Sequence, residues 1–145
     1  ITGMTGHQDN PGSGKTLADD PAPVTDIAQL ARAMGYKRVV TVAAYDLPEL
    51  ERVLKEELDA PEPSVVIAGA PCRIAAKLWN LATYGVDAAK CKACGACFKL
   101  GCPAIERGEA TPDGKRFKSH IDPVQCSGCN LCIQTCKFGA ISKIR

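Results

Sequence analysis

The chain has 145 residues, with 18 lysines and arginines, 16 aspartates and glutamates, and nine cysteines. A net charge of +2 is too balanced to indicate a nucleic-acid-binding surface. The longest apolar stretch, 65–72, is far shorter than the roughly 20 residues that span a bilayer. These values allow one domain, or one domain and part of another, with a core of Ala, Val, Leu and Ile.

The first part of the chain predicts a loop followed by a helix. Residues 1–23 are rich in Gly, Pro and Asp and have no apolar period, which is typical of an extended loop. Residues 24–35 have helical periodicity, and Thr25 or Asp26 can cap the start of the helix. Gly35 is expected to end it.

Strands and helices then alternate. Residues 38–43 and 64–70 are short β-branched runs and predict two buried strands. Between them Asp46 is expected to cap an amphipathic helix with Pro48 in its first turn. A further helix is expected over 71–84. This order predicts a parallel sheet covered by helices.

The composition changes around 86–90, and we place a domain boundary there. Two strands are too few for an independent sheet, so residues 1–87 are expected to be the C-terminal portion of a larger α/β domain. Residues 88–145 are expected to form a second domain. We therefore expect the chain to be the C-terminal part of a longer protein.

The second domain contains an internal repeat. Residues 90–105 read KCKACGACFKLGCPAI and residues 125–141 read QCSGCNLCIQTCKFGAI. Each has three cysteines at two-residue gaps, then a fourth, then Ala-Ile. Between the repeats, Asp113-Gly114 predicts a hairpin turn.

The cysteine spacing predicts two [4Fe–4S] clusters. In the bacterial ferredoxin run C-x2-C-x2-C-x3-C, the fourth cysteine ligates the other cluster, because three thiolates on a tight loop reach only three corners of a cubane. The first cluster is assigned to Cys91, Cys94, Cys97 and Cys136, and the second to Cys126, Cys129, Cys132 and Cys102. One extra residue precedes Cys102, and Lys137 replaces the proline expected after Cys136. Neither departure removes a ligand, so residues 88–145 are expected to form an α+β domain of the bacterial dicluster ferredoxin type.

Two other uses of these cysteines are open. A disulfide framework suits small secreted domains, but this spacing crowds the thiols too closely for separate bridges. Structural zinc pairs two C-x2-C knuckles, which leaves a third cysteine surplus in each run.

Four lysines lie near the cysteines in the sequence, namely Lys92, Lys99, Lys118 and Lys137. Their side chains either are only solvated, or they favour reduction of the clusters and dock an acidic electron carrier.

Two further features have competing interpretations. Residues 11–16 (PGSGKT) resemble a phosphate-binding loop, but the first glycine of that motif is absent, no strand precedes them and Asp19-Asp20-Pro21 stands where a helix should start. Cys72 follows a predicted strand, where ligand crevices form. It also fits a small buried apolar position.

The stretch TGMTGHQDNPGSGKT resembles the diphosphate loop of thiamine-diphosphate-dependent 2-oxoacid:ferredoxin oxidoreductases. The resemblance covers the whole chain, including KACGACFKLGCPAI, and is greatest to the alpha subunits that act on indolepyruvate. It implies that Gly3, Met4 and Thr5 line the diphosphate and that the Ile1 carbonyl binds Mg²⁺. His7 and Gln8 are either structural or near the substrate.

The resemblance also implies an activity and its partners. Such enzymes oxidatively decarboxylate an aryl 2-oxoacid with coenzyme A to give acyl-CoA and CO₂, and pass electrons through the clusters to an external ferredoxin. The expected partner is a beta subunit, in the cytoplasm, and no nucleic acid or membrane is involved. No catalytic acid or base is identified in these residues. The alternatives are a stand-alone dicluster electron carrier, and the same chemistry on pyruvate or another 2-oxoacid.

Overall fold

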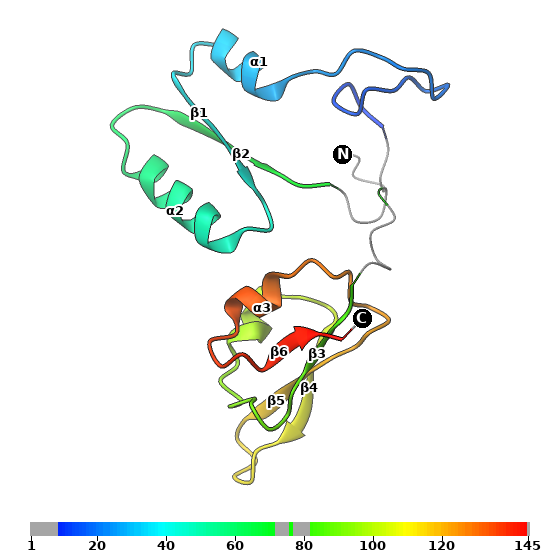
Figure 1. Cartoon of the computed structure of the whole chain (residues 1–145). Coiled ribbons are helices and arrows are strands. Elements are labelled where there is room, and N and C mark those ends of the chain that lie inside the picture. The colour runs from blue at the N-terminus through cyan, green and yellow to red at the C-terminus, as the bar shows by residue number, and fades with distance from the viewer. Residues whose placement is uncertain (1–8, 72–75, 77–81, 145) are drawn as a thin grey trace. The chain divides into compact units, whose positions relative to one another are not determined.

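The computed structural model describes residues 9–71, 76 and 82–144. The chain forms two compact units that divide between Ala76 and Lys77. Figure 1 labels the helices and strands of both units. No helix in the described part is long and apolar enough to cross a bilayer.

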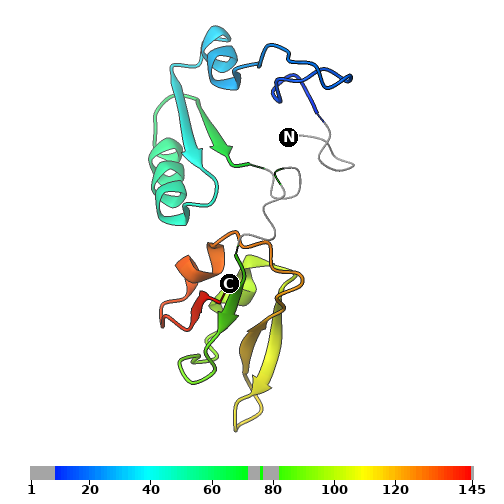
Figure 2. The ribbon, with the colours of Figure 1, turned by 45° about the vertical axis from the view of Figure 1, so that its right-hand side comes forward.

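The first unit contains a pair of parallel strands. Its elements are α1 (Ile27–Ala33), β1 (Arg38–Ala43), α2 (Leu47–Leu58) and β2 (Ser64–Gly69). The pair is in register from Arg38 beside Ser64 to Ala43 beside Gly69. In both views α2 lies alongside the two strands (Figures 1 and 2). The predicted strands and the alternation of helix and strand are thus confirmed.

Both helices of the first unit begin where the sequence predicts. The Asp26 carboxylate accepts a hydrogen bond from the Gln29 N–H at 3.0 Å, and the Asp46 carboxylate accepts one from the Glu49 N–H at 3.2 Å. These bonds satisfy donors that have no partner within the helix. Pro48 lies in the first turn of α2, where its missing N–H has no cost.

The burial predicted for these strands is wrong. Within β1 only Val42 is buried, and β2 has no buried residue. On α2 the side chain of Val53 is 3% exposed, whereas Leu58 is 81% exposed. The reason is geometric, because two strands and two short helices supply too few layers to cover both faces of a sheet.

Tyr84 corrects the helix predicted over 71–84. Most of that segment, 72–75 and 77–81, lies outside the described residues. Tyr84, however, starts β3 (Tyr84–Val86), which pairs antiparallel with β6 (Ile141–Lys143). Its side chain is buried in the core of the second unit. The two units divide between residues 76 and 77, which is earlier in the chain than the boundary after 87 that the change of composition predicts.

The second unit is built from two antiparallel strand pairs and two short helices. β4 (Ile105–Ala110) pairs with β5 (Phe117–Ile121), and the turn between them contains Gly114 at φ +66°, which confirms the predicted hairpin. The 3₁₀ helix η2 (Ala96–Leu100) and α3 (Leu131–Thr135) pack together. The buried core consists of Tyr84, Cys97, Ala104, Ile121, Cys132 and Ile141.

Candidate metal centres

Two cavities in the second unit divide eight cysteines into two sets of four. Each cavity takes three cysteines from one repeat and the fourth from the other repeat. Cys91, Cys94, Cys97 and Cys136 line the first cavity, and Cys102, Cys126, Cys129 and Cys132 line the second. These are the two sets that the spacing predicts. That the thiols bind iron remains a prediction.

An aspartate four residues before the first cysteine of each repeat shapes the loop that leads into it. The Asp87 carboxylate accepts a hydrogen bond from the Ala89 N–H at 2.9 Å, and the Asp87 carbonyl accepts one from the Cys91 N–H at 3.0 Å. In the second repeat the Cys126 N–H donates to the Asp122 carbonyl at 3.1 Å. Backbone N–H donors hold the pKa of both carboxyl groups below the usual value.

Left-handed backbone conformations bend the chain between the cysteines. Ala93 and Gly95 have φ values of +49° and +76°, and their counterparts Gly128 and Asn130 have φ values of +68° and +72°. Successive turns of this kind direct N–H groups to one side and form concave sites for negative charge. Each run of three cysteines thus wraps around a point and does not extend as a strand.

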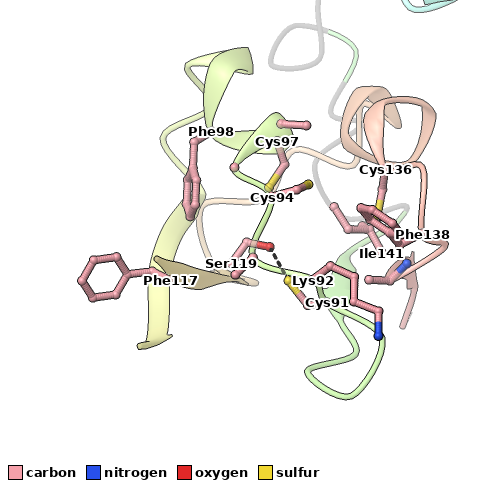
Figure 3. A pocket seen from close by; sticks show the side chains of 14 residues that line it. Cys91, Lys92, Cys94, Cys97, Phe98, Phe117, Ser119, Cys136, Phe138 and Ile141 are labelled. Carbon is pink, nitrogen blue, oxygen red and sulfur yellow. Dashed lines mark hydrogen bonds between the residues drawn. The ribbon is translucent and has the colours of Figure 1, made fainter. Parts of the chain in front are cut away.

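The first cavity surrounds thiols that already have hydrogen-bond partners. The Cys91 sulfur lies 3.8 Å from the Ser119 hydroxyl, and the Ala140 N–H donates to the Cys136 sulfur at 3.4 Å. In Figure 3 the labelled cysteines surround a common space between η2 and the C-terminal segment. The cavity is narrow, about 20 Å³, so the side chains would turn outward to admit a cluster.

Two opposing effects act on Cys91. Burial, the largest single effect, raises the pKa of its thiol. The hydrogen bonds from Ser119 and Ala93 and the charge of Lys118 act together in the other direction, and the net pKa is lowered. This thiol therefore ionises more readily than an isolated cysteine, which suits a metal ligand.

The second cavity is larger, about 220 Å³, and one of its thiols is strongly perturbed. Burial, together with the neighbouring Cys129 and Cys126, raises the pKa of Cys132 to about 11, because burial disfavours the charged form and like charges repel. Three adjacent thiolates need cations close to them. Iron in a cluster would supply that charge.

The donor chemistry fits two [4Fe–4S] clusters better than the alternatives. All eight cysteines of the second unit are free thiols. As the side chains stand, no three His, Cys, Asp or Glu groups among the described residues are close enough together to hold a metal ion, so the thiols would have to reorient around each space. Four soft thiol donors around one space, from two pseudo-symmetric loops, are what a cubane cluster requires.

The residues predicted to bind thiamine diphosphate lie outside the described part of the chain. They are Ile1 for Mg²⁺ and Gly3, Met4 and Thr5 for the diphosphate, and His7, Gln8 and Cys72 are also outside it. The PGSGKT stretch at 11–16 lies in a loop closed by a bridge between Lys15 and Pro21. The next helix, α1, begins only at Ile27.

Three residues that support the cysteines were not among the sequence predictions: Ser119, which lines the first cavity, and Asp87 and Asp122, which shape the loops before the cysteines. Ser119 comes from β5, which carries no cysteine, and only the fold brings it beside Cys91. By contrast, Asp87 and Asp122 stand at equivalent positions of the repeat, as the pattern D-x3-C shows. That pattern was available in the sequence.

Comparison with known families and proteins matches both parts of the chain. A family described as 4Fe-4S binding domain matches residues 119–142, and one described as thiamine pyrophosphate enzyme, C-terminal TPP binding domain, matches residues 1–68. Indolepyruvate oxidoreductase subunit IorA of Pyrococcus horikoshii is 37% identical over 154 aligned residues, which include 100% of this chain. The subunit IorA of Methanothermobacter thermautotrophicus is 35% identical over 97% of the chain. The chain spans about a fifth, 22%, of the length of these relatives.

Proposed function

Since the chain is homologous over its whole length to indolepyruvate oxidoreductase subunit IorA, we propose that it supplies the electron-transfer part of a thiamine-diphosphate-dependent 2-oxoacid:ferredoxin oxidoreductase. The reaction is the oxidative decarboxylation of an aryl 2-oxoacid with coenzyme A. Its products are acyl-CoA, CO₂ and reduced ferredoxin. A beta subunit completes the enzyme.

The observation that carries this proposal is the division of the cysteines between the cavities of the second unit. Two sets of four thiols, each drawn from both repeats, suit a pair of one-electron centres. The match of residues 1–68 to a thiamine pyrophosphate domain favours an enzyme over a stand-alone carrier, because a carrier needs no such domain.

The residues of this chain hold and tune the electron-transfer centres. The cysteines bind iron, while Asp87 and Asp122 fix the loops through their backbone hydrogen bonds. Ser119 and the Ala140 N–H stabilise negative charge on sulfur. When bound, thiamine diphosphate supplies the carbanion chemistry of decarboxylation. Gly3, Met4 and Thr5 are assigned to its diphosphate, and Ile1 to Mg²⁺, on the resemblance alone.

The proposal is tested with the complete protein that contains this chain, assembled with its partner subunit. Indolepyruvate, pyruvate and an aliphatic 2-oxoacid are each supplied with coenzyme A, and CO₂ release and ferredoxin reduction are measured. We expect coenzyme-A-dependent ferredoxin reduction, with the highest kcat/KM for indolepyruvate. Higher kcat/KM for pyruvate would change the substrate class. A protein that reduces ferredoxin with no 2-oxoacid, but only from another reduced donor, would be a carrier.

A matched variant separates decarboxylation from electron transfer. Replacing both Cys102 and Cys136 by serine removes one thiol from each cavity and leaves the thiamine domain untouched. We expect ferredoxin reduction to be lost, while CO₂ release in the absence of an electron acceptor is retained at a low level. Unchanged ferredoxin reduction in this variant would refute the role given to the cysteines.

A further inference from the structure

The surroundings of the two cavities differ in charge. Lys92 lines the first cavity, Lys137 directly follows Cys136, and Lys118 lies close enough for its charge to act on Cys91. No charged residue lines the second cavity. The two cavities therefore match in their cysteines but differ in the charged residues around them.

The exposure of the cysteines differs in the same direction. Cys94 of the first set is exposed, whereas no cysteine of the second set is. Backbone hydrogen bonds reach sulfur in both sets, at Cys91 and Cys136 in the first and at Cys132 in the second. Positive charge and access of water each stabilise the more negative, reduced form of a cluster. Both favour reduction at the first cavity.

The rim of the first cavity also suits a protein partner. Lys92 and Lys137 are both exposed, and neither takes part in an ion pair with another described residue, so both charges are available. Phe138, which lines the same cavity, is 48% exposed. An exposed aromatic side chain flanked by cations is typical of a surface that binds an acidic protein briefly, because charge attraction speeds the encounter.

We propose that the centre held by Cys91, Cys94, Cys97 and Cys136 is the exit point for electrons, and that an acidic one-electron carrier protein docks on Lys92 and Lys137 beside it. In each transfer this centre loses one electron and the carrier gains one. No bond forms and no proton moves. The electron is replaced from the centre in the second cavity, which is supplied by the oxidation of the 2-oxoacid. The inference rests on the proposed function.

The test measures electron transfer from the assembled enzyme after chemical reduction and removal of excess dithionite. Stopped-flow mixing with an acidic [2Fe–2S] ferredoxin gives the second-order rate constant, and basic cytochrome c serves as the acceptor of opposite charge. In K92Q/K137Q we expect this constant to fall about five- to tenfold at low ionic strength, and to approach the unmodified value at high salt. Transfer to cytochrome c should not slow.

A control with the same loss of charge comes from the β4–β5 hairpin. Lys115 and Arg116 line neither cavity, so K115Q/R116Q should leave both rate constants within twofold. Carbodiimide cross-linking to the acidic ferredoxin should join it to Lys92 or Lys137. This is a readout independent of activity.

Several outcomes would overturn the inference. If electron transfer to the acidic ferredoxin slowed equally in K115Q/R116Q, the effect would depend on the net charge of the protein and not on the position of the lysines. Slowing in N130D, which adds a negative charge beside the second cavity, with none in K92Q/K137Q, would move the exit to that cavity. Failure of the proposed function would differ from either, because 2-oxoacids would then not reduce ferredoxin although the chemically reduced enzyme still does.

Discussion

Replacing Cys136 by alanine is expected to remove iron from the centre that also contains Cys94, although the two cysteines belong to different repeats. The expected iron content follows from the two cavities, each of which is lined by four of the eight thiols. Two [4Fe–4S] clusters correspond to about eight irons per chain. The loss of one cluster should leave about four.

Pairs of replacements test the crossed arrangement directly. Cys94 and Cys136 share the first cavity, so C94A/C136A should also retain about four irons, no fewer than either single variant. Cys129 lies in the second cavity, so C129A/C136A should retain almost none. C102A/C129A is the matched same-cavity control, and C72A should keep about eight.

The assay is anaerobic purification of the complete protein, followed by iron and sulfide analysis and absorbance near 400 nm. Elution in gel filtration at the volume of the unmodified protein shows that a variant is still folded. If C94A/C136A lost nearly all its iron while C129A/C136A kept about four, each cluster would be held within a single repeat. Stoichiometric zinc in the unmodified protein would refute the clusters altogether.

Three further predictions concern stability. Glu57, whose side chain is 5% exposed, receives two hydrogen bonds from Arg38 at 2.7 and 2.8 Å, and these hold the pKa of its carboxyl group below the ordinary value of 4.5. The contribution of this pair to the stability of the first unit is therefore present above that pH and is lost as the pH falls through the folded-state value. The protection factors of β1 amides, which correct for the intrinsic pH dependence of hydrogen exchange, should fall in acid, and in E57Q they should already be low at neutral pH. Asn130 has φ +72°, so N130A should lower the free energy of unfolding by about 1 kcal/mol in a denaturant titration while N130G should not; equal losses would remove the backbone as the cause. Iron chelation should unfold the second unit, seen as rapid exchange of its β3 and β6 amides, and retained protection there would contradict a link between metal and fold.

Local signals in the sequence predict much of the fold. Asp46 and Pro48 mark the start of α2 because capping and the fixed φ of proline act within one turn. Asp113-Gly114 marks a hairpin for the same reason, since few residues accept a positive φ. The cysteine spacing predicts the two sets that line the cavities, because the ligand geometry of a cubane is itself a short-range constraint.

Features that depend on distant contacts were not predictable in this way. The sequence before Tyr84 predicts a helix, yet burial of Tyr84 against residues such as Ile121 and Ile141, more than thirty positions away, places it in a strand. Ser119 reaches Cys91 only because β5 folds back beside the first repeat. The burial of β1 depends on how many layers surround it, which its own six residues do not determine.

The second unit joins its metal chemistry to its stability through shared residues. Cys97 and Cys132 belong to the buried core together with small side chains such as Ala104, and no large side chain in the described part is fully buried. A core this poor in large apolar groups gains little from the hydrophobic effect, which scales with the apolar area removed from water. Iron–sulfur bonds between the two repeats would supply what the side chains lack. The crossed sets of cysteines therefore serve the fold as well as electron transfer, since each cluster ties one repeat to the other.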